Sequence, residues 1–237
     1  MAIPILPTAV YDLDKKIIAE AGQPLTYDFF QKLQATRPRT PPPKSFADYP
    51  EILDGLSEYC SQEPYTKIFH TEAVCQQTAD YLGRAHIYPL VLHALNYFKE
   101  HDPYTYRHSL MVAMLATRMA HDFRTIYSYE LAAASVVPSH DIGKINIPLS
   151  LLTKNDELCV EEIMVLRCHA CYGFLLLTYY IGDADPLSCQ IAYEHHEFMN
   201  GKGYPREIRE TSELVELVTV CDMFDALVSP RPYRQDN

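Results

Sequence analysis

Histidine and aspartate residues gather in the second half of the sequence, and side chains of these types could hold metal ions. One stretch, EHHEFMNGKGYP at 194–205, sets His195 beside His196 and follows them with a glycine-rich turn. Neighbouring residues on a straight helix point about 100° apart, so two adjacent histidines do not readily grip one ion from one helix face. Either one of the pair is structural, or the two serve different ions.

Seven histidine and aspartate side chains fall on different predicted helices or at helix ends, as ligands assembled inside a helical bundle must. A single histidine among apolar residues is more often a core or surface side chain than a ligand, so their convergence favours a metal centre. Imidazole with carboxylate suits Mn, Fe, Co or Zn. Two ions about 3.5–4 Å apart would use all seven groups and clamp the attacking and leaving oxygens of a phosphoryl transfer. The seven are His108, His140, Asp141, His169, His195, His196 and Asp222.

The segment HDIGKINIP, 140–148, adds a lysine to this set. A His-Asp dipeptide starts at positions 101, 121 and 140, and only the third is followed by IGK. Gly143 permits a tight turn. Lys144, three residues after Asp141, could reach a phosphate or protonate a departing alkoxide, although a lysine at a helix end is usually just solvated.

The elements that must position these residues are predicted to be helical, since strict strand alternation is nearly absent. The segment 105–123 is apolar on most sides, which is typical of a helix packed in a core and places His108 there. The proline cluster at 37–45 predicts a linker or surface strap. The fold class is expected to be all-α with a smaller, less regular N-terminal module. Helices are expected at 25–33, 46–60, 71–85, 89–100, 105–123, 126–137, 157–180, 186–198 and 212–228.

Composition excludes several classes of protein. The 237 residues are 48% hydrophobic and 22% charged, which is ordinary for a globular protein, and the formal charge of −11 disfavours nucleic acid polymers and anionic membranes. Neither an apolar run of about 18 residues nor a basic N-terminal region is found, so no membrane span or signal peptide is indicated. Seven scattered cysteines argue against a disulfide framework, and Cys168 with Cys171 is interpreted as buried structural thiols. A cytoplasmic location is expected.

Taken together, these motifs resemble the HD-GYP family, bacterial hydrolases of cyclic di-GMP within the HD phosphohydrolases. The resemblance covers roughly residues 97–237 and implies an HD-type helical bundle there, behind an N-terminal variable module at 1–96. It rests on His108, HDIGK (140–144), His169, HHE with GKGYP (195–205), CDMFDAL (221–227) and RPYR (231–234).

The resemblance also implies roles for individual residues. The seven side chains above match the family's metal ligands, with Asp141 as the bridge between two ions, Fe or Mn in the first place and Zn, Co or Ni as alternatives. His195 and His196 would be ligands of neighbouring ions. Lys144 matches the lysine that contacts the scissile phosphate. Tyr204 matches the tyrosine of the GYP loop, and Arg231 and Arg234 match two basic positions that hold substrate phosphates.

Three departures from the family pattern stand out. Some members carry a glutamate that helps to hold a third ion where this chain has Tyr104, so a two-metal centre that stops at linear pGpG is expected. Asn200 replaces an aspartate before the first glycine of the GYP loop. The chain ends three residues after Arg234, where the family's domain usually continues, and it therefore looks shortened at its C-terminus.

The leading hypothesis is a metal-dependent phosphodiesterase in which two ions activate water for in-line attack on one phosphorus of cyclic di-GMP. Lys144 and the arginines would stabilise the departing charge. The alternatives are a degenerate sensor that binds cyclic di-GMP without turnover, and an HD hydrolase of another nucleotide phosphate ester. A related cyclic dinucleotide, a protein partner at the N-terminal module or the GYP loop, and a homodimer remain open as partners.

Overall fold

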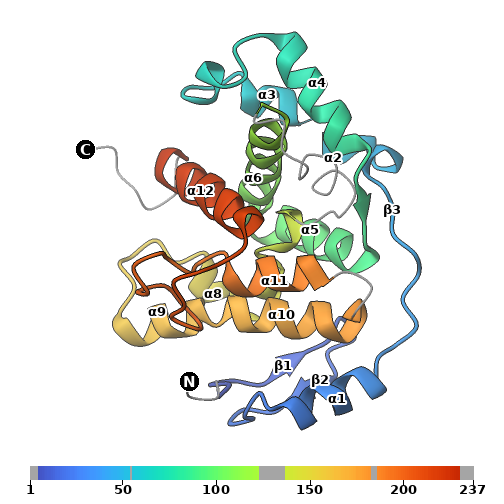
Figure 1. The fold of residues 1–237 in the computed structure, drawn as a ribbon, viewed down its shortest axis with the longest axis vertical. Helices are drawn as coiled ribbons and strands as arrows, with labels where there is room; N and C mark the ends of the chain where they lie inside the picture. The colour runs from blue at the N-terminus through green and yellow to red at the C-terminus, as the bar shows by residue number, and fades with distance from the viewer. Residues whose placement is uncertain (1–4, 54, 123–136, 183–185, 230–237) are drawn as a thin grey trace.

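The computed structural model describes residues 5–53, 55–122, 137–182 and 186–229, and these residues are mostly helical (Figure 1). The expected all-α class is confirmed. Short strands form two antiparallel pairs in the described chain. In one, β1 (Val10–Tyr11) pairs with β2 (Ile17–Ala19), and in the other, β3 (Lys44–Ser45) pairs with β4 (His86–Ile87).

The first described residues pack against one end of the bundle. Thr26 caps helix α1 (Tyr27–Ala35) by accepting a hydrogen bond from Phe29 N at 3.2 Å. Leu33 of α1 shares a buried apolar cluster with Tyr172 of α10 (His169–Tyr180). From there the expected proline-rich strap follows one side of the molecule to β3, which pairs with β4 (Figure 1).

The middle of the chain contributes most of a second and larger core, which residues of the second half complete. It comprises η1 (Phe46–Asp48), α2 (Pro50–Leu53), α3 (Leu56–Cys60), η2 (Tyr65–Lys67), α4 (Glu72–Gly83), α5 (Pro89–His101) and α6 (Pro103–Asp122). Helix α6 is buried along most of its length, as its apolar pattern predicts. Phe46 and Leu56 pack in the same core as Met111 of α6. The boundary predicted between residues 96 and 97 falls inside α5, and the division into two domains stays a prediction.

The second half supplies η3 (Val137–Ser139), η4 (Ile142–Asn146), α8 (Leu149–Leu152), α9 (Val160–Arg167), α10, α11 (Pro186–Glu194) and α12 (Glu213–Val228). The expected helix at 157–180 is two helices, because the chain breaks at Cys168 and His169 begins α10. The expected helix at 186–198 ends at Glu194, where the chain tightens into a turn as Glu197 N donates to the carbonyl of Glu194 at 2.8 Å. Most of the helix expected at 126–137 lies outside the described residues.

Two pairs of packed helices organise this part of the fold. Helix α11 lies along α10, and α12 crosses α6 (Figure 1). Residues far apart in the sequence therefore meet where the ends of these helices converge. None of the described helices has the length and hydropathy to cross a membrane.

Candidate metal centre

Six of the seven proposed ligands form two compact groups. In each group, one nitrogen or carboxylate oxygen from every member lies within 4.8 Å of the others. These side chains come from α6, α10, α12, the turn before η4 and the turn after α11. The first group is His169, His195 and His196, and the second is His108, His140 and Asp222.

Asp141, the seventh predicted ligand, lies between the two groups. Its Oδ1 is 3.4 Å from His169 Nε2 in the first group, and its Oδ2 is 3.4 Å from His140 Nε2 and 3.7 Å from His108 Nε2 in the second. One carboxylate therefore presents an oxygen to each group, which is the arrangement that a bridging ligand requires.

The position of Asp141 depends on the close approach of η4 to α10. A Cβ on Gly143 would lie 1.9 Å from the carbonyl oxygen of His169 and 2.4 Å from the amide nitrogen of Gly173. Only glycine fits at position 143, because the backbones of η4 and α10 approach so closely. The sequence reading assigned Gly143 to a tight turn, whereas the structure uses it to bring η4 and the start of α10 together.

The histidines of the first group are held in the form that binds metals. Burial lowers the pKa of His169 to about 4 and that of His195 to about 3, and it holds the pKa of His196 well below its ordinary value. The Nδ1 atoms of His169 and His195 face the carbonyls of Leu166 and Ile191 at 2.7 Å and 2.9 Å. Neutral imidazoles with Nδ1 bonded in this way direct Nε2 into the site.

His108 has a different environment. Burial favours its neutral form, but hydrogen bonds to Asp222 and Asp225 outweigh burial and raise its pKa to about 9. Its Nε2 is 2.9 Å from Asp222 Oδ1, and its Nδ1 is 2.7 Å from Asp225 Oδ2. A carboxylate behind a ligand histidine fixes the ring and raises its basicity. The sequence reading gave Asp225 no role, although its place three residues after Asp222 on one helix was a usable signal.

His140 provides an independent test of the metal assignment. Its Nδ1 faces the carbonyl of Val137 at 2.6 Å, but its Nε2 is buried and makes no hydrogen bond to any residue that the structure describes. A buried ring nitrogen that makes no hydrogen bond, even with Asp141 Oδ2 3.4 Å away, is unfavourable unless an unseen group satisfies it. Together with the imidazole and carboxylate donors around it, this atom fits a divalent transition metal.

His195 and His196 do not lie on a straight helix, because α11 ends at Glu194. The angular argument made from the sequence therefore does not apply to them. Both belong to the first group, and their ring centroids are 4.1 Å apart. His196 Nδ1 is also 3.8 Å from Asp222 Oδ2 of the second group, so the assignment of the two histidines to separate ions stays a prediction.

Lys144 forms an ion pair with Asp141, the carboxylate that faces both groups. Its Nζ is 2.5 Å from Asp141 Oδ2, and although burial works against the charged amine, Asp141 outweighs burial and raises the lysine pKa. Both residues line a pocket of about 580 Å³. Most residues from Leu151 to Leu158 also line this pocket, although no pattern in the sequence assigned them to the site.

The GYP loop folds back on the ligand turn. The ring of Tyr204 stacks on His196 with centroids 4.6 Å apart, and the guanidinium of Arg167 lies 5.0 Å from the Tyr204 centroid. Gly203 permits this approach, because a Cβ there would lie 2.4 Å from the carbonyl oxygen of His196. Burial raises the pKa of Tyr204, which therefore keeps its proton.

Glu197, the last residue of HHE, holds the far end of this loop. Its Oε1 accepts a hydrogen bond from Arg206 N at 2.5 Å, and its Oε2 accepts one from Ile208 N at 3.0 Å. Glu197 is buried, so these two amides stabilise a carboxylate that would otherwise be costly. Its place in the HHE motif alone did not predict this role.

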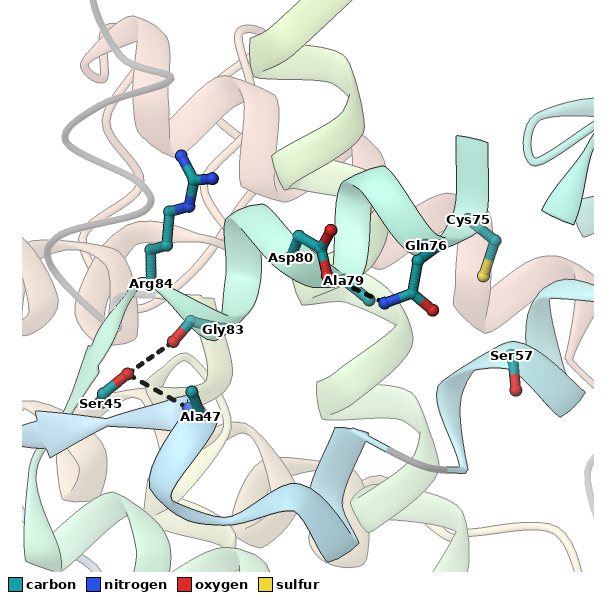
Figure 2. Close-up of a pocket in the computed structure, with 9 residues that line it drawn as sticks. All are labelled: Ser45, Ala47, Ser57, Cys75, Gln76, Ala79, Asp80, Gly83 and Arg84. Carbon is teal, nitrogen blue, oxygen red and sulfur yellow. Dashed lines mark hydrogen bonds between the residues drawn. The ribbon is translucent and has the colours of Figure 1, made fainter. Parts of the chain in front are cut away.

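A second pocket, of about 470 Å³, lies between η1 and α4 (Figure 2). Its polar groups bond to one another: Ser45 Oγ donates to the carbonyl of Gly83 at 2.7 Å, and Gln76 Nε2 donates to Asp80 Oδ1 at 2.9 Å. None of its nine lining residues is a histidine. The pocket beside Asp141 is therefore the stronger candidate for the functional site. The predicted substrate ligands Arg231 and Arg234 lie outside the described residues.

Comparison with known proteins identifies the class. The HD domain family matches residues 95–237, so the chain belongs to this family. It is 37% identical over 147 residues to a cyclic di-GMP phosphodiesterase of Thermotoga maritima, a match that covers 61% of this chain and 40% of that protein. The resemblance to HD-GYP proteins is thereby confirmed.

A further relative has a different named substrate. The chain is 33% identical over 135 residues to 3'3'-cGAMP-specific phosphodiesterase 3 of Vibrio cholerae, covering 56% of this chain and 29% of that protein. A solved structure of Bd1817, an HDG"Y"P protein from Bdellovibrio bacteriovorus, aligns at 16% identity with a TM-score of 0.48 over 95% of this chain and 84% of that one. The chain thus spans well under half the length of these two curated relatives.

Proposed function

We propose that the protein is a metal-dependent phosphodiesterase that hydrolyses cyclic di-GMP to linear pGpG. One observation carries the proposal. The two oxygens of Asp141 face two buried groups of ligand side chains, while Lys144, bound to the same carboxylate, lines the adjoining pocket.

The proposed metal ligands are the seven residues predicted from the sequence, with Asp141 shared between two divalent ions. The resemblance to the family favours Fe or Mn, and the mixed imidazole and carboxylate donors would also suit Zn, Co or Ni. When bound, two such ions supply Lewis acidity and lower the pKa of water toward neutrality. Tyr104, stacked on His108 with ring centroids 5.9 Å apart, is a phenol where a third ion would need a carboxylate, so we propose two ions and little cleavage of pGpG to GMP.

The remaining proposed roles belong to residues around the pocket. Lys144 would neutralise charge that develops on the phosphate and on the leaving oxygen, where a cation placed in advance is most effective. Tyr204 would offer its ring edge and hydroxyl to the nucleotide beside the first group. Arg231 and Arg234 are proposed to hold phosphates on the basis of their sequence positions alone.

The substrate is proposed as cyclic di-GMP because the Thermotoga relative is named for that activity. A second candidate is 3'3'-cGAMP, for which the Vibrio relative is named.

We further propose a cytoplasmic location, in agreement with seven cysteines that are all free thiols. A protein partner at the N-terminal segment or the GYP loop and a homodimer are proposed as open possibilities for assembly.

The test is product analysis with purified protein. The protein would be prepared without oxygen, its bound metal quantified, and its products from cyclic di-GMP, 3'3'-cGAMP and simple nucleotides separated by ion exchange. We expect about two Fe or Mn per chain and accumulation of pGpG. Metal-loaded protein that binds cyclic di-GMP without forming product would instead support the sensor.

Replacing the shared carboxylate tests the site itself. Asp141→Ala should abolish turnover, because both groups lose a ligand and Lys144 loses its partner. The matched control is Asp80→Ala, which removes an aspartate from the second pocket and should keep wild-type turnover. Unchanged turnover in Asp141→Ala with its metal retained would sink the assignment.

A further inference from the structure

Tyr65 lies outside the part of the chain that the HD domain family matches, yet it reaches the metal centre. It belongs to η2 and is 1% exposed. Its hydroxyl donates to Asp225 Oδ1 at 2.5 Å. The other oxygen of Asp225 is the one that bonds His108 Nδ1 at 2.7 Å. Two hydrogen bonds therefore connect Tyr65 to a proposed metal ligand.

The carboxylate of Asp225 needs such a partner. The terminal torsion of an aspartate is broad and roughly two-fold, so a single hydrogen bond to His108 does not fix the carboxylate plane. Tyr65 holds Oδ1, while Ser229 Oγ donates to Oδ2 at 2.7 Å. With both oxygens held, Asp225 fixes the plane of the His108 ring, and His108 Nε2 remains directed at Asp222 and Asp141.

Tyr65 is itself held rigidly. Its ring meets Phe224 of α12 edge-on, with centroids 6.2 Å apart. The guanidinium of Arg107 lies 5.4 Å from the Tyr65 centroid, and Arg107 also donates to the Tyr65 hydroxyl at 2.9 Å. Burial raises the pKa of Tyr65 to about 12, so the hydroxyl keeps the proton that it donates.

We propose that Tyr65 is a positioning residue of the metal centre, which acts through Asp225 to orient His108. The segment ahead of the family domain thus completes the support of the site, and the protein needs that segment for full metal affinity. This inference rests on the proposed metal-dependent function.

The alternative is a tyrosine that serves only the core. Tyr172 provides the matched control, because it is fully buried, it belongs to the other apolar cluster, and its hydroxyl also makes a hydrogen bond of 2.5 Å, to Thr8. Tyr65→Phe and Tyr172→Phe each remove one buried hydroxyl from the full-length protein. Both changes should lower stability, but only the first should alter metal binding.

The experiment measures Mn²⁺ dissociation constants by competition with a chelator, with free Mn²⁺ followed by electron paramagnetic resonance. Loss of a group that orients a ligand typically weakens metal binding by about 10- to 100-fold, and this is the expected effect of Tyr65→Phe. Turnover should return at saturating Mn²⁺. Tyr172→Phe should keep the wild-type dissociation constant.

A double-mutant cycle tests the route through Asp225. In an Asp225→Asn background, Tyr65→Phe should cost no further metal affinity, because the link to His108 is already broken. Equal Mn²⁺ affinity in Tyr65→Phe and wild type, or equal losses with and without Asp225→Asn, would overturn the inference. If wild-type protein bound no divalent metal, the proposed function would fail instead.

Discussion

The carboxylate of Asp141 is bound by a lysine that the same short segment supplies. Burial would raise the pKa of Asp141, but Lys144 and the neighbouring histidines hold it well below its ordinary value, so the carboxylate is ionised at neutral pH. Lys144 therefore shares with these histidines the task of keeping Asp141 charged, and it also places a cation in the pocket. A lysine three residues after the aspartate is close enough to do both.

Substitution of Lys144 should separate catalysis from metal binding. Lys144→Met keeps the length of the side chain and removes its charge. We expect kcat to fall by about 10²- to 10³-fold, the usual cost of removing one group that stabilises transition-state charge, while bound metal stays near the wild-type value. Steady-state kinetics and metal analysis measure the two quantities.

The control for this change is Lys154→Met. Lys154 lines the same pocket, but its partner is Glu162, whose two oxygens are 2.7 Å from its Nζ, and not a proposed metal ligand. We expect its loss to change KM more than kcat. Equal losses of kcat in both variants would mean that Lys144 has no special role.

Residue types could predict which side chains gather at the candidate site, but they could not predict what supports those side chains. His108, Asp141 and Asp222 could be recognised because few side chains bind metal ions and their motifs are local in sequence. The role of Tyr65 depends on a hydrogen bond across 160 positions, which no local pattern records. The break at Cys168 was also missed, since both sides of it are helical and apolar.

The contact between η4 and α10 is the tightest constraint on any element of the site. Gly143 and Gly173 lie at this contact, with Gly143 N 3.3 Å from the position of a Cβ on Gly173. Asp141 precedes Gly143 by two residues, and His169 begins α10. Any separation of η4 from α10 must therefore move a proposed bridging ligand away from a proposed terminal one.

Gly143→Ala should test this constraint. The added methyl group would overlap the backbone of His169 and Gly173, so η4 must shift, and overpacking of this kind typically costs about 1–3 kcal/mol of unfolding free energy. We expect both lower stability in urea and weaker metal binding. The control is Gly55→Ala, where a Cβ would meet nothing within 4 Å. Wild-type metal affinity in Gly143→Ala would contradict the proposed importance of this contact.

The whole molecule is connected across the boundary predicted at residues 96 and 97. Helix α5 crosses it, and one apolar core contains Phe46, Leu56 and Tyr65 from before the boundary and Val218 from after it. A shared core of this kind favours cooperative unfolding. The sequence-based prediction of a separate N-terminal module could not include these contacts, because they join residues far apart in the chain.

Hydrogen exchange should show whether the two parts unfold together. We expect amides of α4 and of α12 to exchange with the same free energy of opening under mildly denaturing conditions, since both helices pack on α6. Mass spectrometry of peptic fragments measures this directly. A population in which α4 exchanges while α12 stays protected would support an independent N-terminal module.

The proline-rich strap determines where a chimera between this chain and a relative could be fused. A chimera fused at the start of the family match, residue 95, would exchange Tyr65 for a foreign residue and would replace both strands of the β3–β4 pair. A junction ahead of Lys44 would carry both along. Recombination between relatives should therefore preserve full metal affinity only when the crossover falls in or before the strap, so the unit that must be exchanged is longer than the shared domain.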